Sequence, residues 1–311
     1  MPQPGGNLQA LAAAEQGGGA GLIVFALDAA GTIWANGQQG AGGAFGGWNG
    51  PKFQNQPTQA AAIAAAGQNN GSLMLVMLDQ QGMTWTLSQQ GGGWGDWEGP
   101  GVGGQVFSWQ SLSAAQQSGN RGIEIWVTDF DGQISTLYQT TPGGEWSSWE
   151  GPGFKGQTGT FDATAAAGQN NGNVMLFALD LDDSVWAIGQ QWAGGDWGGW
   201  SGPNLAGQPG PFQSVAAAEQ SGNRGVELWV VDQGGNITTL YQTTAGGEWS
   251  SWEGPGFKNQ PQPFLRVAAA GQGNGNVLLL AAAKDGSLWY IGQQSPGGDW
   301  GAWESVPGPG S

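Results

Sequence analysis

The hydrophobic pattern of the chain is a series of short apolar runs separated by turn residues, and residues 110–161 show it clearly. Runs of about five residues that are rich in β-branched and aromatic side chains, bounded by Gly, Asn and Asp, predict β-strands joined as hairpins. In this segment the predicted strands are 112–116, 123–128, 134–138 and 146–149. No sustained helical periodicity occurs, so we expect an all-β protein.

The same pattern recurs six times along the chain. An aromatic-x-x-Trp frame occurs in each repeat, and its last residue is Trp48, Trp97, Trp149, Trp200, Trp252 or Trp303. The steps between these residues are 49, 52, 51, 52 and 51 residues. The expected repeats are approximately 9–57, 58–109, 110–161, 162–212, 213–264 and 265–311. Four antiparallel strands per repeat of about 51 residues form the blade of a β-propeller, so a single six-bladed β-propeller domain is predicted over 1–311. A solenoid is the alternative, but it needs capping repeats, and the terminal repeats resemble the inner ones.

A longer period spans two repeats. Residues 136–155 and 239–258 lie 103 residues apart and differ only at Pro142 and Ala245. The same spacing separates Lys52, Lys155 and Lys258. The predicted propeller therefore has an approximate three-fold alternation over its six blades.

Composition narrows the function classes. The chain has 23 acidic and 7 basic residues and a net charge of −16, which disfavours nucleic acid and anionic membranes as partners. It contains neither Cys nor His, which excludes disulfides and removes the usual general base and the commonest zinc ligand, and we expect no cofactor. Apolar runs such as Val277–Ala283 are far too short to insert into a membrane.

The first thirty residues carry no recognisable signal peptide, because a basic stretch followed by an apolar core is missing. The place of action expected for the chain is extracellular or at a surface, which would require a removed leader or another export route.

Glutamine recurs at two positions in every repeat. One follows the first strand, at Gln16, Gln68, Gln117, Gln169, Gln220 and Gln272. The other ends the third strand, at Gln38, Gln89, Gln139, Gln190, Gln242 and Gln293. An amide both donates and accepts hydrogen bonds, so these residues either tie the blades together or bind sugar hydroxyls.

The first aromatic residue of each frame is a candidate platform for a sugar ring. These residues are Phe45, Trp94, Trp146, Trp197, Trp249 and Trp300. Each lies three positions before the second Trp, and in a regular strand that odd offset places the two rings on opposite faces. One ring would then be core, while the other offers a flat apolar surface with an N–H at its edge. The alternative is a contact between blades.

The third strand differs between alternate repeats. Repeats 3 and 5 carry Tyr138 and Tyr241 there, where the other repeats carry a small residue, and they alone contain Arg121-Gly-Ile-Glu124 and Arg224-Gly-Val-Glu227. We therefore expect two kinds of groove between blades. The Arg and Glu side chains beside a Tyr are candidates for binding sugar hydroxyls, and a solvated surface ion pair is the alternative.

The acidic turns Asp129–Asp131 and Asp180–Asp183 suggest calcium ligands only weakly. No ligand run ending in Glu follows either of them, and hairpin-turn chemistry explains both.

The repeat unit resembles that of bacterial propeller lectins of the Photorhabdus lectin family. The likeness is best in residues 123–152 and 226–255, where an apolar strand with Glu, an Asp/Gly turn and a strand ending in Gln precede Gly-Gly-x-Trp-x-x-Trp. The resemblance implies a sugar-binding propeller with shallow sites between blades, for fucose or O-methylated glycans. That family has seven blades, whereas this chain has six repeats.

Three function classes follow. The first is a multivalent lectin for glycans on cell surfaces, with avidity from repeated weak sites. The second is a propeller glycosidase, which needs a pair of carboxylates, whereas polar residues repeated in every unit indicate no unique centre; an enzyme is therefore not expected. The third is a protein-interaction scaffold. The sequence does not determine the oligomeric state.

Overall fold

Six antiparallel sheets make up the protein, which we describe from a computed structural model covering residues 8–17, 21–68, 70–90, 93–105, 108–118, 121–222 and 224–306. We number the sheets 1 to 6 in chain order. Sheet 1 contains β1 (Leu8–Glu15), β2 (Leu22–Asp28) and β3 (Ile33–Gly37), and sheet 2 contains β4 (Ala60–Gly67), β5 (Leu73–Asp79), β6 (Thr84–Gln90) and β7 (Gly93–Trp94). Sheet 3 contains β8 (Ser111–Gln116), β9 (Ile123–Thr128) and β10 (Ile134–Tyr138), and sheet 4 contains β11 (Phe161–Gly168), β12 (Val174–Asp180) and β13 (Val185–Gly189). Sheet 5 contains β14 (Phe212–Glu219), β15 (Val226–Asp232) and β16 (Ile237–Tyr241), and sheet 6 contains β17 (Phe264–Gly271), β18 (Val277–Ala283), β19 (Leu288–Gly292) and β20 (Glu304–Ser305).

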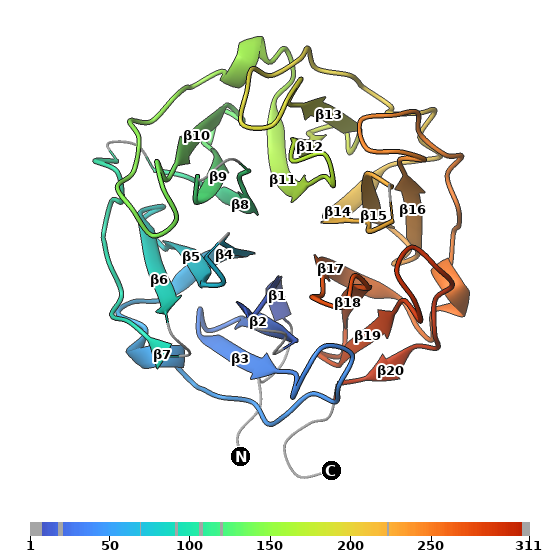
Figure 1. The fold of residues 1–311 in the computed structure, drawn as a ribbon, viewed down its shortest axis with the longest axis horizontal. Helices are drawn as coiled ribbons and strands as arrows, with labels where there is room; N and C mark the ends of the chain where they lie inside the picture. Colours follow the sequence, from blue (N-terminus) through green and yellow to red (C-terminus); the bar gives the residue numbers. More distant parts are fainter. Residues whose placement is uncertain are drawn as a thin grey trace.

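The sheets stand around a central axis, and the first strand of each sheet lies innermost (Figure 1). Short 3-10 turns follow the outer edges of three sheets, at η2 (Phe53–Asn55), η3 (Phe154–Gly156) and η4 (Phe257–Asn259). Within the described ranges, no helix is long and apolar enough to cross a membrane. The all-β prediction is confirmed, and the first three predicted strands of residues 110–161 agree with β8, β9 and β10.

The fourth strand of each blade is less regular than predicted. Only sheets 2 and 6 have a fourth strand among the described residues, and each of these strands is two residues long. The other sheets carry isolated bridges at their outer edge, such as Gln139 to Trp146 and Thr136 to Glu150 in sheet 3. The aromatic frames therefore follow the outer edge of the sheets without the two-residue alternation of a regular strand.

Consecutive sheets pack face to face, and we call each interface a seam, named by its two sheets. Six buried hydrophobic clusters lie in the six seams. The middle strand of a sheet contributes to both of its seams: in β2, Val24 faces seam 6/1 and Phe25 faces seam 1/2. Because both faces are covered, the middle strands read as nearly continuous apolar runs in the sequence.

Seam 6/1 joins the two terminal sheets through side chains. Sheet 1 is built entirely from the N-terminal repeat and sheet 6 from the C-terminal one, and β1 contacts β17 on one side as it contacts β4 on the other (Figure 1). Val24 of β2 and Leu280 of β18 lie in the same cluster. Arg266 Nε also donates a hydrogen bond to the Gln9 carbonyl, at 3.1 Å.

Gly202 is required where the outer edge of sheet 4 crosses Trp186. Its φ is 147°, and a Cβ built on it would lie 2.6 Å from the Trp186 ring. We expect Gly202→Ala to lower the free energy of unfolding by about 1–3 kcal/mol through overpacking. Gly199→Ala is the control, because a Cβ there meets no atom within 4 Å. Denaturant unfolding of both variants checks the prediction, and equal stability of the two would contradict it.

Candidate functional site

The recurring glutamines meet in pairs across four of the six seams among the described residues. The glutamine after the first strand of one sheet shares a side-chain hydrogen bond with the glutamine that ends the third strand of the next sheet. The pairs, donor first, are Gln190–Gln117 (3.3 Å), Gln169–Gln242 (2.8 Å), Gln293–Gln220 (2.8 Å) and Gln272–Gln38 (3.2 Å). We call this contact the glutamine clasp. All of these side chains are buried, which confirms the interpretation that the amides tie the blades together.

The glutamines of the clasp also make hydrogen bonds within their own sheets. In sheet 4, for example, Gln190 Oε1 accepts a hydrogen bond from the Val174 N–H at 3.0 Å. Gln117, Gln169, Gln220 and Gln272, which were candidates for sugar contact, therefore direct their amides into the clasp.

Gln68, another candidate for sugar contact, differs from these residues. It is 4% exposed, and neither of its amide atoms has a hydrogen-bond partner among the described residues. Its counterpart across seam 2/3 by position is Gln139, which bonds instead to the N–H of Ile123 (3.3 Å) and the carbonyl of Gly144 (3.4 Å). Seam 2/3 thus lacks the clasp.

The two aromatic residues of each frame pack in the same seam, so the prediction of opposite faces was wrong. Trp146 and Trp149 both contact the cluster of seam 2/3, and Trp197 and Trp200 both contact that of seam 3/4. The same holds for Trp94 and Trp97, Trp249 and Trp252, and Trp300 and Trp303. The alternation rule fails because these segments are bridged at isolated points and are not regular strands.

The candidate platforms Trp94, Trp146, Trp197, Trp249 and Trp300 are half-buried. Trp197 packs edge-on against Trp126 and Phe154, with ring centroids 5.8 and 5.2 Å apart. The second Trp is anchored more firmly: the Trp200 indole donates to the Phe154 carbonyl at 3.1 Å. The first Trp of each frame therefore belongs to a seam and is also reachable from its open end.

Two seams carry a stacked Arg–Tyr pair. The Arg121 guanidinium lies 4.8 Å from the Tyr138 ring centroid, and the Arg224 guanidinium lies 5.2 Å from that of Tyr241. Arg224 also reaches the next blade, since a Cβ on Gly297 would lie 3.8 Å from its Nε. Such a pair holds a planar set of donors in a fixed position at the mouth of the seam.

Glu124 and Glu227 lie beneath these pairs. Glu124 stands opposite Tyr138 in the β9–β10 register, and Glu227 stands opposite Tyr241 in β15–β16. Each Glu is 4% exposed, so neither side chain lies at the solvated surface. The alternative of a solvated surface ion pair was therefore wrong. The Arg-Gly-x-Glu motif did not reveal that the Glu is buried, because its burial comes from the neighbouring sheets that cover both faces of the middle strand.

Glu124 is hydrogen-bonded within its own sheet. The Thr136 hydroxyl donates to Glu124 Oε1 at 2.6 Å and also lies 2.9 Å from the Ile125 carbonyl. A hydroxyl has one hydrogen, so Thr136 donates to one of these two oxygens at a time. Thr239 makes the same two contacts with Glu227 and Leu228, at 2.7 and 2.9 Å.

Burial favours the neutral form of both groups. Loss of hydration raises the pKa of Glu124 and that of Glu227 to about 8, against an ordinary value of 4.5. The amides of Gln117 and Gln220 donate to the other carboxyl oxygens, which links each neutral acid to the glutamine clasp.

The acidic turns fold as hairpins, as the turn interpretation predicted. Asp180 Oδ1 accepts the N–H groups of Asp182 (3.0 Å) and Ser184 (2.9 Å). Its Oδ2 accepts the Trp186 indole N–H at 2.7 Å, and Asp79 binds Trp85 in the same way at 3.0 Å. These carboxylates support the local turn and the neighbouring Trp.

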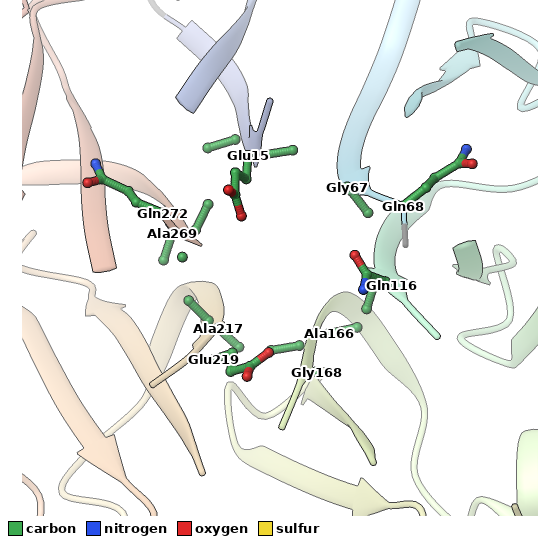
Figure 2. A pocket seen from close by; sticks show the side chains of 18 of the residues that line it. Glu15, Gly67, Gln68, Gln116, Ala166, Gly168, Ala217, Glu219, Ala269 and Gln272 are labelled. Carbon is green, nitrogen blue, oxygen red and sulfur yellow. The ribbon is translucent and has the colours of Figure 1, made fainter. Parts of the chain in front are cut away.

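A polar collar at one end of the central axis was missed by sequence reasoning. Figure 2 shows Glu15, Gln116 and Glu219 pointing into a cavity of about 530 Å³. They occupy one register position in sheets 1, 3 and 5, where the even sheets place Gly67, Gly168 and Gly271. Burial raises the pKa of both glutamates, and the charge of Glu15 raises that of Glu219 further. The residue just before each recurring glutamine could have indicated this collar, because it alternates along the chain between a polar residue and Gly.

Comparison with known proteins places this fold among the β-propellers. No protein-family model and no curated protein matches the sequence. Among solved structures, a lectin from Burkholderia pseudomallei has a TM-score of 0.64 and 19% identity, covering 96% of this chain and 100% of that chain. A fungal lectin from Aleuria aurantia, described as a six-bladed β-propeller with a novel fucose recognition mode, has a TM-score of 0.66 and 18% identity, covering 97% of each chain. The SapL1 lectin, solved with α-methyl fucoside, has a TM-score of 0.63 and 18% identity, covering 99% of each chain.

The chain therefore has the fold of six-bladed β-propeller lectins, as its six sheets indicate. The named neighbours are lectins and not enzymes. At these identities the likeness describes the fold, and the site must be argued from this chain's own residues.

Proposed function

We propose that this protein is a multivalent carbohydrate-binding lectin that acts on cell-surface glycans, with fucosylated glycans as its preferred ligands. The observation that carries the proposal is the Arg–Tyr pair at the mouths of seams 3/4 and 5/6, each beside a half-buried frame Trp. The fucose ligands named for the structural neighbours support the choice of sugar. The repeat motif, which resembles that of the Photorhabdus lectins, extends the candidates to O-methylated glycans.

Each part of this site has a chemical role. The guanidinium of Arg121 or Arg224 donates hydrogen bonds to sugar hydroxyls, and the Tyr ring holds it in place. Trp197 or Trp300, from the next blade, offers its edge and part of its face to the apolar side of a pyranose. The neutral Glu below the pair keeps the clasp intact without placing a negative charge under the Arg. The two sites are 103 residues apart in sequence, and a glycan-bearing surface could occupy both at once.

Removing the arginines tests this proposal. Each charge-assisted hydrogen bond contributes about 1.5–3 kcal/mol. We therefore expect Arg121→Ala with Arg224→Ala to weaken binding of α-methyl fucoside roughly 10–100-fold. Either single variant should halve the number of high-affinity sites found by titration calorimetry. Arg266→Ala is the control, because Arg266 bonds to the Gln9 and Leu265 carbonyls, outside both sites.

Two results would contradict the proposal. Undiminished fucoside binding by the double variant would place the sugar elsewhere, and absence of saturable binding across a broad glycan panel would remove the lectin function itself.

A further inference from the structure

Seam 2/3 contains an open hollow at the position where seams 3/4 and 5/6 are filled. Its volume is about 650 Å³, and Trp94 and Trp146 line it. The cross-strand pair in this place is Met74 with Ser88, where seam 3/4 has Glu124 with Tyr138. The smaller serine and the absence of an Arg leave the space unfilled.

Trp146 is exposed to space on two sides. It lines this hollow and also a second one of about 400 Å³, which Trp109 and Trp149 complete. A ring that lines two hollows can offer its apolar surface to a ligand more fully than Trp197, which packs against Trp126 and Phe154.

The hollow is acidic. Asp96, Glu98 and Glu145 line it, no Lys or Arg does, and the three carboxylates have no ion-pair partner in the described ranges. Asp96 is particular to this blade, because the same frame position holds Gly47, Ser148, Gly199, Ser251 and Ala302 in the others. The charge of this seam therefore differs in sign from that at the Arg–Tyr sites.

Gln139 is the polar side chain that lines the hollow from sheet 3. In four other seams the equivalent glutamine shares a hydrogen bond with the glutamine of the preceding sheet. In seam 2/3 that glutamine is Gln68, which lines the central cavity and has no hydrogen-bond partner among the described residues. The hydrogen-bonding capacity that Gln139 does not spend on a clasp is therefore available to a ligand hydroxyl.

We propose that the hollow of seam 2/3 is a separate saccharide site that selects a sugar with a protonated amino group, such as a glucosamine oligomer. The Trp rings take the apolar face of the pyranose, the carboxylates pair with the ammonium group, and Gln139 meets a hydroxyl. The inference rests on the proposed carbohydrate-binding function and assigns a second ligand class to a seam without an Arg–Tyr pair.

The test compares a glucosamine trimer with its N-acetylated counterpart by titration calorimetry at pH 6 and low salt. We expect one site per chain for the amine form and at least roughly 10-fold weaker binding of the acetylated form, as expected for loss of one charged contact. The triple variant Asp96→Asn, Glu98→Gln, Glu145→Gln should lose this difference while keeping its fucoside binding. A charge-matched control, Asp131→Asn with Asp182→Asn and Asp285→Asn, removes the same charge from exposed hairpin turns and should bind as the parent does.

The outcomes distinguish the two proposals. Equal affinity for the two trimers, or equal loss in the triple variant and its control, overturns the selection for an amino sugar. Binding of fucoside but of neither trimer overturns this site alone. Failure of every saccharide to bind overturns the lectin function as well.

Discussion

Raising the pH from 5 to 8 should lower the free energy of unfolding steeply, with Glu124 and Glu227 as the largest contributors. Burial raises the pKa of each from 4.5 to about 8. Between these values the folded chain keeps two protons that the unfolded chain has released, so stability falls as the pH rises. The contribution is fully present below pH 4.5 and is lost through pH 8, at a slope of up to about 1.4 kcal/mol per pH unit for each carboxyl.

The neighbouring charges change this result little. Arg121 and Lys155 lower the pKa of Glu124 and Glu150 raises it, but loss of hydration is the largest cause. Arg224, Lys258 and Glu253 act on Glu227 in the same way.

The double variant Glu124→Gln, Glu227→Gln is the matched test. A glutamine can accept from the Gln117 amide and donate to Thr136, yet it does not titrate. Urea unfolding at several pH values should show a clearly shallower slope for this variant. Some slope will remain, because burial also raises the pKa of Glu15, Asp162 and Glu219. An unchanged slope would mean that the two acids are already ionised in the folded protein.

Trp126→Ala should destabilise the protein by about 3–5 kcal/mol, because it empties a large site in seam 3/4. Trp126 is fully buried and packs against the edge of Trp197. Trp126→Phe should cost less than about 1.5 kcal/mol. The middle strands of sheets 1 and 4 place Phe25 and Phe177 at this position, and the Trp126 indole N–H has no partner among the described residues.

Trp192→Ala is the control for this series. Its side chain is 54% exposed, so the change in unfolding free energy should stay within about 0.5 kcal/mol. Denaturant unfolding of the three variants checks the order. A similar loss for Trp126→Phe and Trp126→Ala would show that the indole itself, and not its volume, holds the seam.

The fold was predictable because the repeat was visible in the residues that form turns and seams. The spacing of the Trp frames and the apolar runs, such as 123–128, locate six blades without any knowledge of tertiary structure. Side-chain direction was harder to predict. The offset between Trp146 and Trp149 gave the wrong faces because the outer edge is bridged only at points.

The site was predictable only in part. Arg121 and Tyr138 could be paired from their occurrence in alternate repeats, and the structure brings them into contact. The protonation of Glu124 could not be foreseen, since it depends on cover from the neighbouring sheet. The hollow beside Trp146 forms because seam 2/3 has neither the Tyr nor the Arg of seams 3/4 and 5/6. A single sequence gives little indication of such an unfilled space.

Bringing the two terminal sheets together at seam 6/1 costs little chain entropy. The clasp between Gln272 and Gln38 spans 234 residues, whereas the other clasps span 73. The entropy of loop closure grows only with the logarithm of loop length, so the long connection costs roughly 1 kcal/mol more than a short one. Ordinary side-chain packing can offset that difference, which explains how the terminal sheets meet although, among the described residues, they exchange no strand.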